Sequence, residues 1–174
     1  MERLKAVSAD RFDSVRAFYW CLIDEMGGRG NTVGWKKGIY PSNDYLRESL
    51  CRGWMYALED DEGFLACVIL NSLWNQGYDG VNWSVDCPRG DVIVPHALAV
   101  RANAQGKGIG LQVVRSLIGI AKNSGKKTIR LDLLAGNIAA EHLYIKAGFH
   151  TVAEKNLFYE DTGLTRFLLY EFVL

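Results

Sequence analysis

The sequence predicts a single α/β domain over residues 1–174, built on a mixed β-sheet, and three observations predict it. The length of 174 residues fits one domain with its own core. A buried strand, a helix and a second strand follow one another in the middle of the chain, which predicts a parallel pair. Two strand pairs, one before and one after this unit, are expected to be antiparallel hairpins. The predicted order is β-α-α-β-β-β-α-β-α-β-β.

The chain is expected to begin with a short strand and two helices. Residues 3–8 alternate between polar and apolar side chains, as in a strand. Apolar residues then recur at helical spacing and predict a helix over 12–26 with Asp10 as its N-cap. A second helix is expected to begin at Ser42 or Asn43.

A hairpin and a buried strand follow these helices. Residues 53–60 and 63–70 read as two strands joined by a tight turn that ends in Gly63. Residues 91–100, "DVIVPHALAV", are almost continuously apolar, as in a central strand. Pro95 cannot donate a hydrogen bond to a neighbouring strand, so we expect a bulge or an unpaired side there.

The last third of the chain is expected to alternate helices and strands. A helix over 108–123 precedes a strand over 127–135. Asn137 is expected to cap a shorter helix that runs to about Lys146. The chain then closes with a hairpin of two strands, residues 149–159 and 165–174.

The composition excludes several classes of function. Lys+Arg and Asp+Glu are balanced at 20 each, so we expect neither a nucleic-acid partner nor a polybasic membrane anchor. No apolar run approaches the ~18 residues of a transmembrane helix, and the polar start predicts no signal peptide. The four cysteines lack any metal-ligand spacing, so we expect no metal and a reducing, cytoplasmic location.

Three glycines, Gly106, Gly108 and Gly110, lie where the buried strand gives way to the helix. Glycines at this position let the free backbone N–H groups of a helix start point toward an anion such as phosphate. A tight turn without a ligand is the alternative. A P-loop is excluded because no GxxxxGK[ST] string occurs, and the dinucleotide fingerprint fails because Val113 stands at its third glycine.

Two motifs carry a resemblance to a known family. Gln105-Gly106-Lys107-Gly108-Ile109-Gly110 follows "LAV", and "AGNIAAEHLYIKAGF" follows the next strand. Together they resemble the two coenzyme A motifs of the GCN5-related N-acetyltransferases (GNAT). The resemblance covers nearly the whole chain and is clearest over residues 91–149. The stretches "GWKKGIYP" and "GYDGVNW" resemble a bacterial branch of small members.

This resemblance implies a GNAT fold, in which the central parallel strands splay apart, and acetyl-CoA as the acyl donor. It also implies which residues bind the cofactor through main-chain groups, the glycine turn and the last helix. They are Leu98, Ala99, Val100, Gln105, Gly106, Lys107, Gly108, Ile109, Gly110, Leu111, Asn137 and Tyr144.

Acetyl transfer to an amine requires a proton donor for the leaving thiolate, and the resemblance assigns this role to Tyr144. A phenol with a pKa near 10 is protonated at neutral pH, as a general acid must be. Tyr144 follows Asn137 by two helical turns, so both side chains face the same way. The alternatives are a helix cap for Asn137 and a purely structural packing role for Tyr144.

The same reaction needs a base, because an alkyl amine is almost fully protonated at pH 7. His96, with an ordinary pKa near 6.5, is the candidate, and a pH–rate limb near 6 to 7 is then expected. "HALAV" resembles a strand of the arylalkylamine N-acetyltransferases, although Val94 stands where a second histidine, or in other members a glutamate, is found. A buried structural histidine and a water relay remain the alternatives, and Asp132 is expected to be structural.

The acceptor is expected to be the primary amine of a small molecule. Candidate substrate residues are the aromatic side chains Trp35, Tyr40, Tyr78 and Trp83. A protein N-terminus or lysine is the alternative acceptor. A non-catalytic acyl-CoA-binding module and a general nucleotide-phosphate-binding domain are the rival functions. A homodimer is compatible with the sequence.

Overall fold

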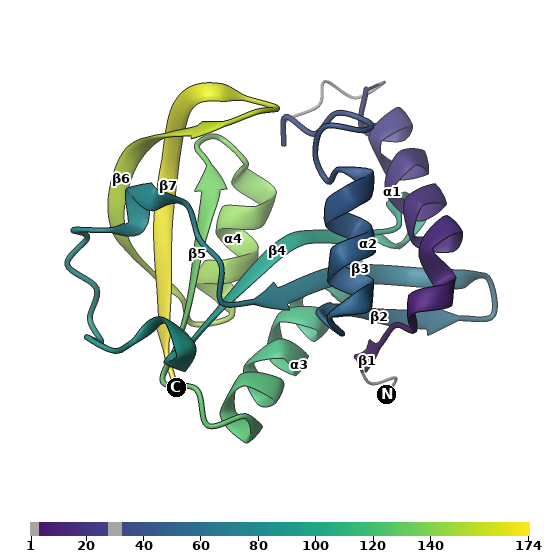
Figure 1. The fold of residues 1–174 in the computed structure, drawn as a ribbon. Coiled ribbons are helices and arrows are strands. Elements are labelled where there is room, and N and C mark those ends of the chain that lie inside the picture. Colours follow the sequence, from purple (N-terminus) through teal and green to yellow (C-terminus); the bar gives the residue numbers. More distant parts are fainter. Residues whose placement is uncertain (1–3, 28–32) are drawn as a thin grey trace.

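The computed structural model describes residues 4–27 and 33–174, and seven strands form one sheet in the order β1-β2-β3-β4-β5-β7-β6 (Figure 1). The strands are β1 (Lys5–Ala6), β2 (Met55–Asp60), β3 (Gly63–Asn71), β4 (Val92–Val100), β5 (Thr128–Leu134), β6 (His150–Tyr159) and β7 (Gly163–Val173). The helices are α1 (Phe12–Gly27), α2 (Asn43–Cys51), α3 (Ile109–Asn123) and α4 (Ile138–Lys146). The predicted order of elements and the mixed α/β class are therefore confirmed.

The parallel strands β4 and β5 pair only where they begin. Val92 lies opposite Thr128 and Ile93 opposite Ile129, and the register continues no further. In Figure 1 the two strands start close together near the C-terminus and separate along their length. The predicted splayed pair is present. Pro95 pairs with Leu70 on β3 but lies two residues beyond the last residue of β4 that pairs with β5, so its missing N–H interrupts no bond between β4 and β5.

A bulge in β4 lies two residues beyond Pro95. Cys67 pairs with Ala99 but Ile69 pairs with His96, so three steps along β4 oppose two along β3. The extra residue bends the strand, and Ala97 has a φ of 48°, a left-handed conformation rare for alanine. Leu98 consequently has no register partner on β3.

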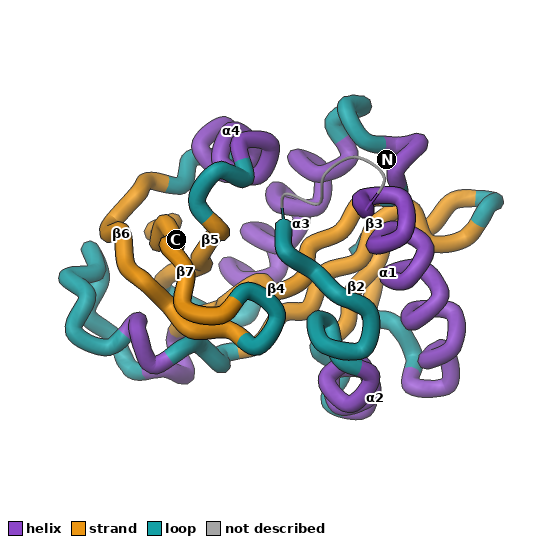
Figure 2. Tube along the Cα trace, turned by 90° about the horizontal axis from the view of Figure 1, so that it is seen from above, coloured by secondary structure: helices purple, strands orange, loops and turns teal. Residues whose placement is uncertain are grey.

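Helices cover both faces of the sheet. One apolar cluster joins α3 and α4 to the sheet through residues such as Val113, Leu117 and Leu131. A second cluster joins α1 and α2 to the other face through residues such as Val15 and Leu46. Seen from above, α3 and α4 lie on one side of the strands and α2 on the other (Figure 2). The split between β4 and β5 is therefore flanked by helices on two sides.

The start of the chain differs from the sequence prediction. The strand expected over residues 3–8 pairs only through Lys5 and Ala6. The predicted N-cap role of Asp10 is wrong, because Asp10 lies inside a 3₁₀ turn over Ala9–Arg11 that leads directly into α1. Ser8 precedes this turn and donates its hydroxyl to the Asp10 carboxylate. The polar pair stabilises the turn rather than the helix end.

The segment between β3 and β4 covers the outer half of the sheet, on the same face as α1 and α2. It contains 3₁₀ turns at Gln76–Tyr78 and Arg89–Asp91. Tyr78 packs on Leu157, Phe167 and Leu169, the third apolar cluster. This segment therefore replaces a helix as the cover of β5, β7 and β6.

Candidate active site

A cavity of about 480 Å³ lies at the split between β4 and β5. Leu131 and Asp132 both line it, although neighbouring residues of a strand point to opposite faces of a sheet. Tyr144 lines it from the α4 side, and Tyr40 and Tyr78 line it from the other side. The cavity therefore passes through the sheet and opens toward both layers.

The glycine turn presents free backbone N–H groups at the start of α3. Gly108 precedes the helix with a left-handed φ of 83° and provides no side-chain cap. The first helical hydrogen bond of α3 runs from Gln112 N–H to Gly108 O at 3.1 Å. The N–H groups of Ile109, Gly110 and Leu111 consequently lack partners within the helix and can bind an anion.

The three glycines serve different purposes. Gly106 and Gly108 have positive φ, and a Cβ at either position would meet no atom within 4 Å. Their backbone conformation, rather than close packing, therefore calls for glycine. A Cβ on Gly110 would lie 3.2 Å from Leu143 on α4, so this glycine allows the two helices to approach.

The other loop residues surround this turn. The side-chain amide of Gln105 donates to Val100 O at 3.0 Å and holds the loop against the end of β4. Lys107 is exposed. Arg101 is engaged elsewhere, because its guanidinium pairs with Asp60 at 2.5 Å and Glu62 at 3.2 Å.

Substitution of Gly108 by alanine is expected to lower the free energy of unfolding by about 1–2 kcal/mol, the cost of a left-handed non-glycine residue. Gly119 provides the matched control, since it lies inside α3 and a Cβ there meets no atom within 4 Å. Gly119→Ala should raise the free energy of unfolding by up to about 1 kcal/mol. Urea unfolding followed by circular dichroism measures both free energies. A change in the same direction in the two variants would contradict the need for a left-handed glycine at position 108.

Tyr144 lies on α4 with its ring 5.2 Å, centroid to centroid, from that of Phe149. The side chain is buried, and burial raises the pKa of its phenol above the ordinary value. Within the described residues its hydroxyl has no hydrogen-bond partner, and the residue lines the cavity. The phenol is therefore protonated and available to donate.

Asn137 is the N-cap of α4, and its side-chain oxygen accepts from Ala140 N–H at 3.3 Å. It also lines the cavity. The helix-capping alternative is thus realised, and the side-chain amide nitrogen is still able to donate to a ligand.

His96 is held by its Nε2 atom, which lies 2.9 Å from Asn71 Oδ1 and 3.1 Å from Leu73 O. Both partners are acceptors, so we assign the hydrogen of the neutral ring to Nε2, which leaves Nδ1 as a free acceptor. Burial lowers the pKa of His96 to about 4. The ordinary pKa expected from the sequence is therefore not retained, and the ring is neutral at pH 7.

Three of the four predicted substrate aromatics line the cavity, namely Trp35, Tyr40 and Tyr78. Trp83 does not line it. The Trp83 indole N–H donates to Tyr78 O at 3.2 Å, and Arg130 lies 4.5 Å from its ring centroid. Trp83 therefore supports the cavity wall from behind.

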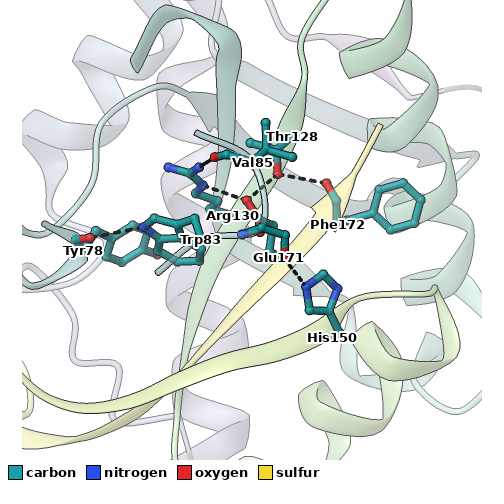
Figure 3. Close-up of polar contacts among 9 residues, drawn as sticks. Tyr78, Trp83, Val85, Thr128, Arg130, His150, Glu171 and Phe172 are labelled. Atoms are coloured by element: carbon teal, nitrogen blue, oxygen red, sulfur yellow. Dashed lines mark hydrogen bonds and ion pairs between the residues drawn. The ribbon is translucent and has the colours of Figure 1, made fainter. Parts of the chain in front are cut away.

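A buried ion pair anchors this wall to the sheet (Figure 3). Arg130 Nε on β5 lies 3.0 Å from Glu171 on β7, and the two side chains are 5% and 0% exposed. Glu171 also accepts from Ser84 N–H at 2.6 Å, and Arg130 donates to Val85 O. The pair thus joins two strands to the segment that carries Tyr78.

Asp132 is a cavity residue that the sequence interpretation treated as structural. The Tyr159 hydroxyl donates to its Oδ2 at 2.7 Å, and Tyr78 lies near it in the cavity wall. Burial raises the pKa of this carboxyl above its ordinary value. A single acidic residue in the apolar run "RLDLL" was the available signal.

Within residues 4–27 and 33–174 there is no group of three or more His, Cys, Asp or Glu side chains that could hold a metal ion. No helix in the same ranges is long and apolar enough to cross a membrane.

The chain is similar in fold to solved acetyltransferases. A GNAT-family acetyltransferase from Streptococcus agalactiae 2603 superposes with a TM-score of 0.80 at 15% identity, over 99% of this chain and 95% of that one. AAC(6')-Ib, in complex with paromomycin and acetyl-CoA, gives a TM-score of 0.67 at 18% identity, over 98% and 92% of the two chains. At these identities the likeness shows the fold alone.

Sequence comparison identifies the family. The uncharacterized N-acetyltransferase YobR of Bacillus subtilis (strain 168) is 40% identical over 57 residues, which are 33% of this chain and 23% of that protein. The match therefore spans less than a quarter of that relative. The model of the acetyltransferase (GNAT) family matches residues 15–149, well over half of the chain. The chain belongs to the acetyltransferase (GNAT) family.

Proposed function

We propose that this protein transfers the acetyl group of acetyl-CoA to a primary amine of a small molecule. The observation that supports this most directly is the cavity that passes through the sheet where β4 and β5 split, with Tyr144 in its wall. Donor and acceptor can meet in such a cavity from opposite faces. The presence of acetyl-CoA in the similar structure of AAC(6')-Ib supports the choice of donor.

The residues present fit acetyl-CoA. The free N–H groups at Ile109, Gly110 and Leu111 suit the pyrophosphate, and the open space at Gly106 and Gly108 gives it access. Main-chain groups of β4, which diverges from β5, would hold the pantetheine arm through Leu98, Ala99 and Val100. Asn137 and the exposed Lys107 complete the set of candidate contacts. When bound, acetyl-CoA supplies a thioester as the acyl donor.

The chain's own groups handle the charges of the reaction. Leu98 has no register partner on β3 because of the bulge in β4. Its N–H is therefore suited to stabilise negative charge on the acetyl oxygen. The Tyr144 hydroxyl donates a proton to the departing sulfur. An alkylammonium loses two protons when it becomes an amide. One of them restores the proton on the Tyr144 hydroxyl, and the other is released to water.

A water molecule held by the free Nδ1 of His96 would take the first proton from the incoming amine. Its Nε2–H is fixed by Asn71, whose oxygen also accepts from Leu73 N–H at 2.9 Å. The ring orientation is therefore set. With a pKa of about 4 the ring is a weak base, so it directs the water rather than storing the proton.

The proposal is tested by thermal shift with acetyl-CoA, followed by CoA release across a panel of small amines. Stabilisation by acetyl-CoA in preference to ATP or NAD, and CoA release with at least one amine, are expected. No stabilisation by acetyl-CoA would remove the proposed donor. Stabilisation without release for any amine, peptide N-termini and lysine included, would favour an acyl-CoA-binding module.

The titration of His96 gives a separate prediction. Because its pKa is about 4, the NMR signals of its ring should not titrate between pH 6 and 8. The signals that disappear in His96→Gln are thereby assigned to this residue. The unfolded chain binds the proton near pH 6.5, so the folded state should lose stability as the pH falls from about 6.5 toward 4. A pH–rate limb near 6 to 7 that vanishes in His96→Gln would contradict the buried, neutral ring.

A further inference from the structure

The cavity contains a partly buried carboxylate that has no cationic partner among the described residues. Asp132 lines it from the face opposite Leu131, and among the described residues its side chain accepts one hydrogen bond, from the neutral phenol of Tyr159. No Lys or Arg is among the described residues that line the cavity. Withdrawing a carboxylate from water is costly unless a positive charge or several donors compensate it, so a cationic ligand would stabilise this arrangement.

A second carboxylate strengthens the negative character of the same cavity. Asp161, in the turn between β6 and β7, lines the cavity and is 9% exposed. Burial is the main cause of the raised pKa of the Tyr40 phenol. Both carboxylates lie near enough to raise this pKa further. The nearby Lys36 acts on Asp161 but does not line the cavity. The acceptor side of the sheet is therefore acidic.

The walls around these carboxylates suit an organic cation. Aromatic side chains line the cavity on this side, and ring faces attract ammonium and guanidinium groups. They are Trp35, Tyr40, Tyr45, Trp74, Tyr78 and Tyr159. The wall already binds one cation from outside the cavity, since the guanidinium carbon of Arg89 lies 4.1 Å from the Trp74 ring centroid.

We propose that the acceptor carries a second cationic group besides the amine that is acetylated, and that Asp132 binds this second group. The chemical class is a small diamine or an amine with a guanidinium end. This inference rests on the proposed acetyl transfer and specifies its acceptor.

The reacting nitrogen itself is a poor partner for Asp132. A carboxylate beside an ammonium stabilises its charged form and reduces the neutral fraction that can attack. A second cation has no need to lose its proton. Asp132 and Tyr144 also approach the cavity from opposite faces of β5, which separates the charge-binding end from the reacting end.

The experiment compares diamines of three to six carbons with the amino alcohols of equal length, in which a hydroxyl replaces one ammonium. In the wild type the best diamine should exceed its amino alcohol in kcat/KM by about tenfold to a hundredfold, the typical gain of a charge-assisted hydrogen bond. In Asp132→Asn this ratio should fall to near one, through a higher KM for the diamine. Asp86→Asn, an exposed carboxylate outside the cavity, should keep the wild-type ratio.

Two outcomes would overturn the inference. One is a wild-type ratio near one for every chain length. The other is an equal loss of kcat on diamine and amino alcohol in Asp132→Asn, which would make Asp132 act on the reacting nitrogen. A thermal shift with acetyl-CoA on each variant confirms that the donor site is intact. Failure of the proposed function appears instead as no CoA release with any amine.

Discussion

Replacement of Tyr144 by phenylalanine is expected to lower kcat by about 10²-fold, the usual contribution of a general acid. The thiolate of CoA is a poor leaving group without a proton, and the Tyr144 hydroxyl is the donor that lines the cavity from the α4 side. Steady-state release of CoA with the best amine of the panel measures the effect. KM for the amine should change little, because the acceptor side of the cavity is untouched.

The same substitution should leave the fold intact. Within the described residues the Tyr144 hydroxyl has no protein partner to lose, and the ring contact with Phe149 is kept by phenylalanine. The melting temperature should therefore stay within about 2 °C of the wild type, since an exchange that leaves no buried group unpaired is nearly neutral. Wild-type turnover in Tyr144→Phe would remove the proposed role.

Tyr170 offers a matched control for this experiment. It is buried in the same apolar cluster, 1% exposed, but it lies on β7 and does not line the cavity. Tyr170→Phe should keep kcat within about twofold, as expected of a residue remote from the reacting groups. A large loss of turnover in both variants would indicate that the core, rather than the proton of Tyr144, had been disturbed.

Local signals in the sequence predicted the parts of the fold that local chemistry determines. The glycine turn at Gly106 and Gly108 is such a part, because a positive φ excludes most other residues. Asn137 as the cap of α4 is another, since its side chain bonds an amide three residues away. The splayed strands followed from the family resemblance that these two motifs support.

The acceptor side of the site could not be predicted in the same way. Asp132 meets Tyr159 across 27 residues of sequence and Tyr78 from an irregular segment with no periodic pattern. The low pKa of His96 arises from burial by distant parts of the chain, which an isolated histidine does not reveal. Trp83 was grouped with the substrate aromatics although it packs behind Tyr78, because aromatic character alone does not indicate a direction.

Removal of the charge of Glu171 is expected to destabilise the protein strongly. Glu171→Gln leaves the Arg130 guanidinium, whose side chain is 5% exposed, without its counter-ion in the interior. Breaking one partner of a buried pair costs about 3–5 kcal/mol, and the free energy of unfolding should fall by that amount. Urea unfolding at neutral pH measures it.

Glu154→Gln is the control, because Glu154 pairs with Arg166 at 3.4 Å on the surface and both side chains are more than half exposed. An exposed pair contributes about 0–1 kcal/mol, so this variant should be nearly neutral. An equal fall in the free energy of unfolding in the two variants would show that the buried pair does not stabilise the sheet.

Glu171 also accepts from Ser84 N–H, so its loss should loosen the segment that carries Tyr78. At temperatures where Glu171→Gln is still folded, KM for the amine should therefore rise while stabilisation by acetyl-CoA persists, since the glycine turn lies on the other side of the split strands.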